Sequence, residues 1–138
     1  MKRRAPAQRS DTTWTDADTQ RLQEGLQHLS VTLDETAFAK VVQWARLLKQ
    51  WNRTFNLLGN SDSAHLIDEH LLDSLAIVPV LERYLPQPEE ALVDVGTGAG
   101  FPGVVVALLR PDLDVTLIET MERRTQWLSD VVEELGLD

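Results

Sequence analysis

The sequence contains no cysteine, which excludes disulfide bonds and thiolate metal sites and gives no indication of an oxidising compartment. It also lacks an apolar run of roughly 18 residues, the length that a membrane-spanning helix needs. Residues 1–11, MKRRAPAQRSD, are basic, but no apolar segment follows them, so they do not have the form of a secretory signal. We therefore expect a cytoplasmic protein that does not enter a membrane.

Cationic residues are scarce outside the N-terminus. The 138 residues hold 13 lysines and arginines against 22 acidic residues, a net charge of −9. Four of the cations lie within the first nine residues, so from residue 10 onward nine cations face 22 acids, a charge of −13. This balance excludes a protein that coats nucleic acid with its whole surface, and any RNA contact must use a local patch. Residues 1–13 are predicted to be a disordered basic tail.

Apolar periodicity predicts a helical region over residues 14–85 in a chain whose composition is that of an ordinary globular protein. The first helix is expected from Thr15, in a sequence close to a capping box, to Leu29. The second begins near Asp34, and its apolar residues recur every three or four positions as far as Phe55. This second segment is the strongest helix prediction in the chain.

A third helix is expected after the turn residues at 56–63. Its N-cap is predicted at Ser61 or Asp62, and its apolar positions continue toward Val80. The two prolines of residues 86–90 exclude regular structure and predict a linker.

The pattern changes at residue 90. Residues 91–95, ALVDV, and 115–119, VTLIE, predict two strands with a glycine-rich loop and a helix between them. A further helix is expected from Arg123 to Leu135, with Gly136 as its C-terminal cap. The order strand, helix, strand, helix predicts parallel strands with right-handed crossovers, the opening of a doubly wound α/β sheet.

Two strands are few for such a sheet, because parallel strands normally have neighbours and are covered on both faces. We therefore expect residues 90–138 to form only part of a Rossmann-like domain and the chain to be a fragment. Unpaired sheet edges would make such a fragment prone to associate.

The glycine-rich loop, DVGTGAGFPG at residues 94–103, is the strongest sign of a binding site. Glycine at 96, 98 and 100, directly after a parallel strand, lets the backbone approach a ligand at the amino end of the next helix. Pro102 suits the first turn of that helix, and Gly103 permits close contact between helix and strand.

Two classes of cofactor fit this loop. Gly98, Gly100 and Gly103 satisfy the dinucleotide pattern G-x-G-x-x-G, and Glu119 ends the second strand where either cofactor places its ribose. Asp94 discriminates, because its carboxylate would repel a pyrophosphate and attract the ammonium group of a methionine moiety. We therefore predict S-adenosyl-L-methionine, with NAD as the alternative.

These segments together resemble the RsmG (GidB) family, the small-subunit ribosomal RNA guanine-N7 methyltransferases. The similarity covers about residues 38–137. It is carried by the glycine loop, the strand segment ALLRPDLDVTLIE and short motifs on the helices, namely Trp51-Asn52 with Asn56-Leu57, His70 with Asp73-Ser74-Leu75, and Arg123-Arg124 with Trp127-Leu128.

The resemblance implies a class I methyltransferase fold with a helical N-terminal extension and a guanine of 16S rRNA, in the small ribosomal subunit, as substrate. It implies that Gly96 and Phe101 contact the cofactor, that Gly98 and Gly100 shape its pocket, and that Glu119 binds the ribose hydroxyls. Members of the family continue through several more strands, which hold further cofactor contacts. We therefore expect these 138 residues to bind S-adenosylmethionine weakly or not at all, and a catalytically inactive remnant is a second alternative.

Methylation of guanine N7 requires no general base, because N7 carries a lone pair and no proton leaves before attack. Positioning and electrostatics are expected to supply the catalysis, so no catalytic residue is assigned.

Five further residues are candidates for the crevice or the substrate. His70, Asp73 and Ser74 would share one face of a regular helix. The alternative for His70 is a position on the helix surface or a buried hydrogen-bonding role. Arg123 and Arg124 open the last helix, either to contact RNA phosphates or to pair with nearby glutamates. The three histidines show no zinc-like ligand spacing, so no metal is expected.

Overall fold

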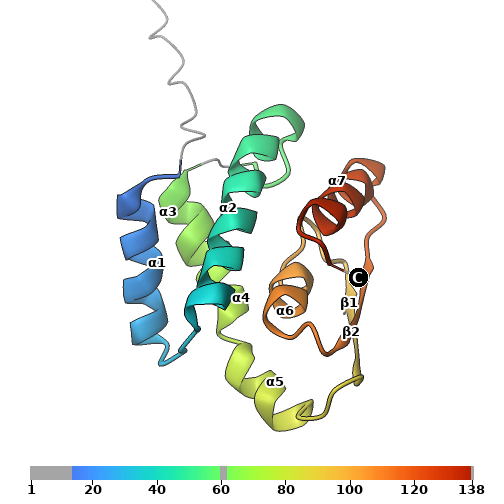
Figure 1. Cartoon of the computed structure of the whole chain (residues 1–138). Helices are drawn as coiled ribbons and strands as arrows, with labels where there is room; N and C mark the ends of the chain where they lie inside the picture. The colour runs from blue at the N-terminus through green and yellow to red at the C-terminus, as the bar shows by residue number, and fades with distance from the viewer. Residues whose placement is uncertain (1–13, 60–61, 138) are drawn as a thin grey trace, which may run out of the picture.

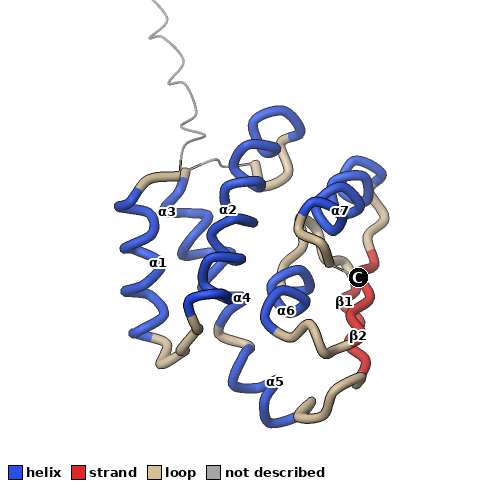
Figure 2. Tube along the Cα trace, in the orientation of Figure 1, coloured by secondary structure: helices blue, strands red, loops and turns tan. Residues whose placement is uncertain are grey.

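The computed structural model describes residues 14–59 and 62–137, so the predicted tail at 1–13 lies outside the described residues. Helices α1 to α5 precede a small α/β part (Figures 1 and 2). The elements are α1 (Asp16–His28), α2 (Glu35–Phe55), α3 (Ser63–His65), the π-helical turn η1 (Leu66–Leu71), α4 (Leu72–Leu75), α5 (Val78–Tyr84), β1 (Ala91–Val95), α6 (Gly103–Leu109), β2 (Asp114–Ile118) and α7 (Glu122–Glu134).

The first two helices confirm the predictions made from their caps and periodicity. Thr15 caps α1 with a reciprocal capping box, in which Asp18 N–H donates to Thr15 Oγ1 and Thr15 N–H donates to the Asp18 carboxylate over 2.8 Å. Asp34 caps α2 by accepting from Ala37 N–H over 2.7 Å. Helix α2 ends at Phe55, and its C-cap residue, Asn56, starts the turn that follows with a left-handed backbone (φ 48°).

The third predicted helix is wrong as a single element, although its N-cap at Asp62 is confirmed. It contains a π-helical turn, in which Leu72 N–H donates to Ile67 C=O, and it stops before α5. Pro79 accounts for the break, because proline has no N–H and its ring would clash with the carbonyl four residues earlier. The helical region then continues past Val80 to Tyr84.

The α/β part has the predicted parallel order. Strands β1 and β2 pair in register from Ala91 opposite Asp114 to Val95 opposite Ile118. Helix α6 begins at Gly103, so that Pro102 takes the N-cap position rather than the first turn. The fold class is therefore confirmed as α/β with a helical N-terminal region, as in part of a class I methyltransferase.

The predicted cap at Gly136 is also confirmed. Its φ of 63° is left-handed, its N–H donates to Glu133 C=O over 3.1 Å, and Leu137 N–H donates to Val132 C=O over 2.9 Å. This pair of bonds is the Schellman motif, which satisfies the last carbonyl groups of α7.

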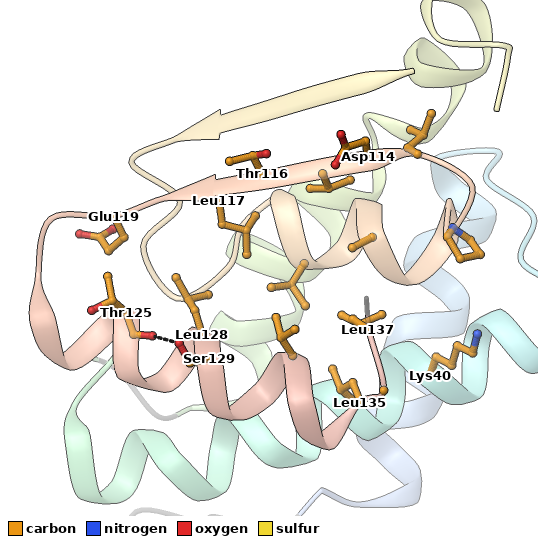
Figure 3. A pocket seen from close by; sticks show the side chains of 17 residues that line it. Lys40, Asp114, Thr116, Leu117, Glu119, Thr125, Leu128, Ser129, Leu135 and Leu137 are labelled. Carbon is orange, nitrogen blue, oxygen red and sulfur yellow. Dashed lines mark hydrogen bonds between the residues drawn. The ribbon is translucent and has the colours of Figure 1, made fainter. Parts of the chain in front are cut away.

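The sheet has a covered face and an open face. Its inner residues pack toward α6 and α7, whereas Val93, Val95 and Ile118 on the other face are 56%, 75% and 44% exposed. A groove of about 780 Å³ runs along the edge of β2 that does not face β1. Figure 3 shows side chains of β2 and α7 on its two sides, with Glu119 at one end. The groove has the position that a neighbouring strand occupies in a larger parallel sheet.

One hydrophobic core joins the helical region to the α/β part. Helix α2 lies between α1 on one side and α6 and α7 on the other (Figure 1). The centre of this core is formed by side chains that are at most 1% exposed, among them Trp44, Leu48, Ile67, Val104 and Trp127. Each such side chain contributes about 1.5–3 kcal/mol of burial free energy. Trp44 of α2 also contacts the glycine loop, because its ring centre lies 4.7 Å from that of Phe101.

Candidate functional site

The glycine loop leaves β1 at the carboxyl end of the sheet, with Gly96, Gly98 and Gly100 at φ of 73°, 61° and 113°. A Cβ atom added to Gly96 or Gly98 would meet no other atom within 4 Å, so open space lies above both. A Cβ atom at Gly100 would instead lie 2.5 Å from Val104 Cγ2, which identifies Gly100 as a packing glycine. Gly96 and Gly98 therefore provide the clearance that a ligand on the loop needs.

Hydrogen bonds from two elements, β2 and α7, hold this loop in place. Ile118 C=O, at the end of β2, accepts from the N–H groups of Gly96 and Thr97 over 2.8 and 3.1 Å. From α7, Trp127 Nε1 donates to Ala99 C=O over 2.8 Å within the core. Because these anchors come from separate elements, the loop is positioned by the whole fold rather than by its own sequence.

Asp94 fastens the junction between the loop and α6. Its Oδ2 accepts from Gly103 N–H over 2.9 Å. A Cβ atom at Gly103 would lie 2.2 Å from Leu117 Cδ2 and 2.8 Å from Asp94 Oδ2, which confirms that Gly103 permits close contact between helix and strand. A carboxylate accepts about four hydrogen bonds, so Asp94 retains acceptor positions for a cationic ligand group.

Glu119 fastens the other side of the loop. Its Oε2 accepts from Gly98 N–H over 2.8 Å, and its Oε1 accepts from the N–H groups of Thr120 and Met121 over 3.0 and 3.1 Å. These backbone donors, that of Met121 first, hold the pKa of Glu119 below its ordinary value against the opposing effect of burial. Asp94 on β1 and Glu119 directly after β2 thus flank the loop, an arrangement that favours a cationic ligand.

A second hollow, which we call the arginine pocket, adjoins the loop and has a volume of about 510 Å³. It brings together five of the predicted site residues, which come from η1, the glycine loop and the start of α7: His70, Gly98, Phe101, Arg123 and Arg124. Residues 56–59 form its remaining wall, a contribution that sequence reasoning missed as part of a site. Asn52 is the residue that could have indicated this ordered turn, because a buried asparagine in a helix can bind the backbone of the segment that follows. In the structure, Asn52 Oδ1 accepts from Leu58 N–H over 2.7 Å.

His70 lies against the loop from η1. The centre of its ring is 5.0 Å from that of Phe101 and 5.2 Å from that of His65. Its Nε2 is buried without a hydrogen-bond partner among the described residues. Burial, with a smaller contribution from His65, lowers the pKa of His70, and the charges of Glu69 and Asp73 only partly oppose this.

The structure does not bring Asp73 and Ser74 to the arginine pocket. Asp73 is exposed and lines a groove against α1, and Ser74 is 5% exposed without lining the pocket. The π-helical turn accounts for this, because residues three and four apart share a face only where the helix has 3.6 residues per turn.

The lowered pKa of His70 predicts a pH dependence. We expect its imidazole to titrate below the ordinary value of 6.5. At a pH between the lowered pKa of the folded chain and the ordinary 6.5 of the unfolded chain, the imidazole of His70 is protonated in the unfolded chain and neutral in the folded one. The contribution of His70 to stability is therefore complete above pH 6.5 and declines as the pH falls below it. Imidazole nitrogen shifts measured by NMR from pH 4 to 8 test this range, which is about two units on either side of an ordinary histidine. A midpoint at or above 6.5 would contradict the buried position of His70.

Two absences bear on the site. Within residues 14–59 and 62–137, no three His, Asp or Glu side chains lie close enough together to hold a metal ion. No helix in the same ranges is long and apolar enough to span a membrane.

Comparison with known proteins identifies the family. The family model of GidB, rRNA small subunit methyltransferase G, matches residues 37–138. A protein of Halorhodospira halophila is 47% identical over 116 residues, which are 84% of this chain and 53% of that protein. A protein of Neisseria meningitidis strain FAM18 is 38% identical over 119 residues, 86% of this chain and 55% of that protein. A protein of Alkalilimnicola ehrlichii is 40% identical over 116 residues, 84% and 50% of the two chains.

These three relatives bear the name ribosomal RNA small subunit methyltransferase G, and the chain spans about half the length of each. The match includes both strands, the glycine loop and all of the residues that line the arginine pocket. By this match, the chain belongs to the GidB family of rRNA small subunit methyltransferase G.

Proposed function

We propose that this protein transfers a methyl group from S-adenosyl-L-methionine to N7 of a guanine in 16S rRNA of the small ribosomal subunit, in the cytoplasm. The names of its relatives support rRNA methylation, and the position N7 and the choice of 16S rRNA rest on the resemblance of its motifs. Because the chain spans about half the length of these relatives, we propose that its described residues provide the glycine loop and the acidic part of the cofactor site.

One observation supports the methyl donor over a dinucleotide. In dinucleotide sites, the N–H groups of the glycine loop and of the following helix receive the pyrophosphate. Here Gly98 N–H donates to Glu119 and Gly103 N–H donates to Asp94. A pyrophosphate would have to displace two carboxylates, whereas a ligand with a sulfonium and an ammonium group is attracted by them.

Four residues at the loop have proposed roles. Glu119 accepts hydrogen bonds from the ribose hydroxyls, Asp94 faces the ammonium group, and the backbone at Gly96 and Gly98 gives the ligand room. The bound cofactor supplies an electrophilic methyl group on a sulfonium. Since guanine N7 has a lone pair available, the chain only has to hold the two reactants in line and exclude water, and no side chain has to remove a proton.

Glu119 provides the test of this proposal. We expect Glu119→Gln to bind S-adenosylhomocysteine about 10- to 100-fold more weakly, because hydrogen bonds to a charged group contribute about 1.5–3 kcal/mol. Backbone amide shifts in an NMR titration measure this even if the parent chain has a dissociation constant on the order of 1 mM.

Glu122→Gln is the matched control, because Glu122 is exposed at the start of α7 and does not line the arginine pocket. It removes the same charge and should leave the affinity within about twofold, a difference below 0.5 kcal/mol. Equal affinity of Glu119→Gln and the parent chain would remove the role proposed for Glu119.

A further inference from the structure

The arginine pocket contains two cationic side chains, Arg123 and Arg124, and the nearest acidic influence on them is weak: the charge of Arg124 is the smallest of the causes that lower the pKa of Glu119. The ion pairs of Arg21 with Asp68 and of Arg110 with Asp112 include neither Arg123 nor Arg124. Among the residues that line the pocket there are two arginines and no aspartate or glutamate. In a chain with a net charge of −9, this is a local basic patch of the kind that binds an anion.

The amino end of α7 adds to this positive potential. Helix α7 has 13 residues, and its N-cap residue, Met121, provides no side-chain hydrogen bond. The N–H groups of Arg124 and Thr125 both donate to Met121 C=O. The remaining N–H groups of the first turn and the helix dipole favour a negatively charged group beside Arg123.

Two buried polar atoms lie in the same pocket without partners. Thr97 is 2% exposed, and its Oγ1 has no hydrogen-bond partner among the described residues. The Nε2 atom of His70 is likewise buried and unpartnered. Both residues line the arginine pocket. A buried hydroxyl without a partner costs free energy, and a ligand that accepts a hydrogen bond from it removes this cost.

These donors fit a phosphate group. The two guanidinium groups and the Thr97 hydroxyl all donate, and phosphate oxygens only accept. Phe101 adds an aromatic surface at the pocket wall, against which a base can stack. The pocket volume of about 510 Å³ lies in the range of small-ligand sites, large enough for one nucleotide.

We propose that the arginine pocket binds a phosphate of the RNA chain beside the nucleotide that is methylated. This proposal rests on the proposed function and specifies how its substrate is held. Arg123 and Arg124 neutralise the phosphate, and Thr97 and His70, which also line the pocket, donate to its oxygens. As contacts to the backbone of RNA, they position the substrate without reading its sequence.

The first experiment compares guanosine 5′-monophosphate with guanosine in amide NMR titrations of the chain. We expect the monophosphate to shift the amides of Thr97, Gly98 and Arg123, and guanosine to bind at least about 10-fold more weakly, the effect of losing one charged contact. The double variant R123Q/R124Q should weaken monophosphate binding by at least about 10-fold. The control R46Q/R83Q removes two exposed arginines outside the pocket and should change it by less than about twofold.

Thr97→Val separates ligand binding from structure. It removes a hydroxyl that has no partner in the fold, so we expect the variant to be at least as stable as the parent in urea while binding the monophosphate several-fold more weakly. If Thr97 had a purely structural role, the variant would be less stable in urea and would bind the monophosphate as tightly as the parent does. Unchanged monophosphate binding in either Thr97→Val or R123Q/R124Q would overturn the proposal.

Two further ligands separate this proposal from the proposed function. S-adenosylhomocysteine should bind R123Q/R124Q as it binds the parent chain. Failure of S-adenosylhomocysteine to bind any variant, with monophosphate binding intact, would count against the methyl-donor site and support the phosphate site.

NADPH carries a 2′-phosphate that an arginine after the second strand can accept. Shifts of the same amides with NADPH and none with the monophosphate would overturn the RNA assignment.

Discussion

Replacing Gly103 with valine is expected to destabilise the α/β part by about 3–5 kcal/mol, a large part of the stability of a small domain. The new Cβ atom would lie 2.2 Å from Leu117 Cδ2 and 2.8 Å from Asp94 Oδ2. The clash therefore pushes α6 away from both strands and breaks the hydrogen bond between Gly103 N–H and Asp94. Urea denaturation followed by circular dichroism measures the loss.

Gly136→Asn is the control for replacing a glycine. Gly136 has a left-handed φ of 63°, and an added Cβ atom would meet nothing within 4 Å. Asparagine tolerates this conformation, so a change within about 1 kcal/mol is expected. If Gly103→Val were as stable as Gly136→Asn, the close packing of α6 on the strands would not exist in solution.

Truncation of Trp127 to alanine should cost about 3–5 kcal/mol, as for other large aromatic residues removed from a core. Trp127 is 1% exposed, and its ring centre lies 5.3 Å from that of Trp51 on α2. The variant loses both this contact between α7 and α2 and the hydrogen bond to Ala99 C=O. The glycine loop is expected to lose its fixed position, which broadened amide signals of residues 96–101 would show.

Trp127→Phe isolates the hydrogen bond from the packing. Phenylalanine keeps an aromatic ring in the core but cannot donate to Ala99 C=O, which is then buried without its partner. A destabilisation of about 1–3 kcal/mol is expected for such an unsatisfied carbonyl, less than for alanine. Equal stability of Trp127→Phe and the parent chain in urea would mean that this bond does not anchor the loop.

Features that depend on short stretches of sequence were predicted well. The capping box at Thr15, the strand after residue 90 and the C-terminal cap at Gly136 each follow from a few adjacent residues. The break before α5 is equally local, because Pro79 marks it, although the apolar pattern that predicts one helix continues across it.

Features that depend on the assembled fold were not predictable in the same way. The π-helical turn in η1 changes the spacing of side chains, so Asp73 faces α1 while His70 faces the loop. The sequence placed Asp94 and Glu119 beside the loop as candidate cofactor residues, but their hydrogen bonds to backbone N–H groups depend on distances between separate elements. The turn at 56–59 also reaches the site only in the assembled fold, because the position of α2 places it beside the glycine loop.

We propose that the glycine loop suits a positively charged methyl donor, because Asp94 and Glu119 occupy the N–H groups that a diphosphate would need. The most direct test titrates the labelled chain separately with S-adenosylhomocysteine and with NADH and follows the amides of Gly96, Gly98 and Gly103. S-adenosylhomocysteine is predicted to shift these amides, and NADH is predicted to leave them in place. Shifts caused by NADH alone would contradict the account.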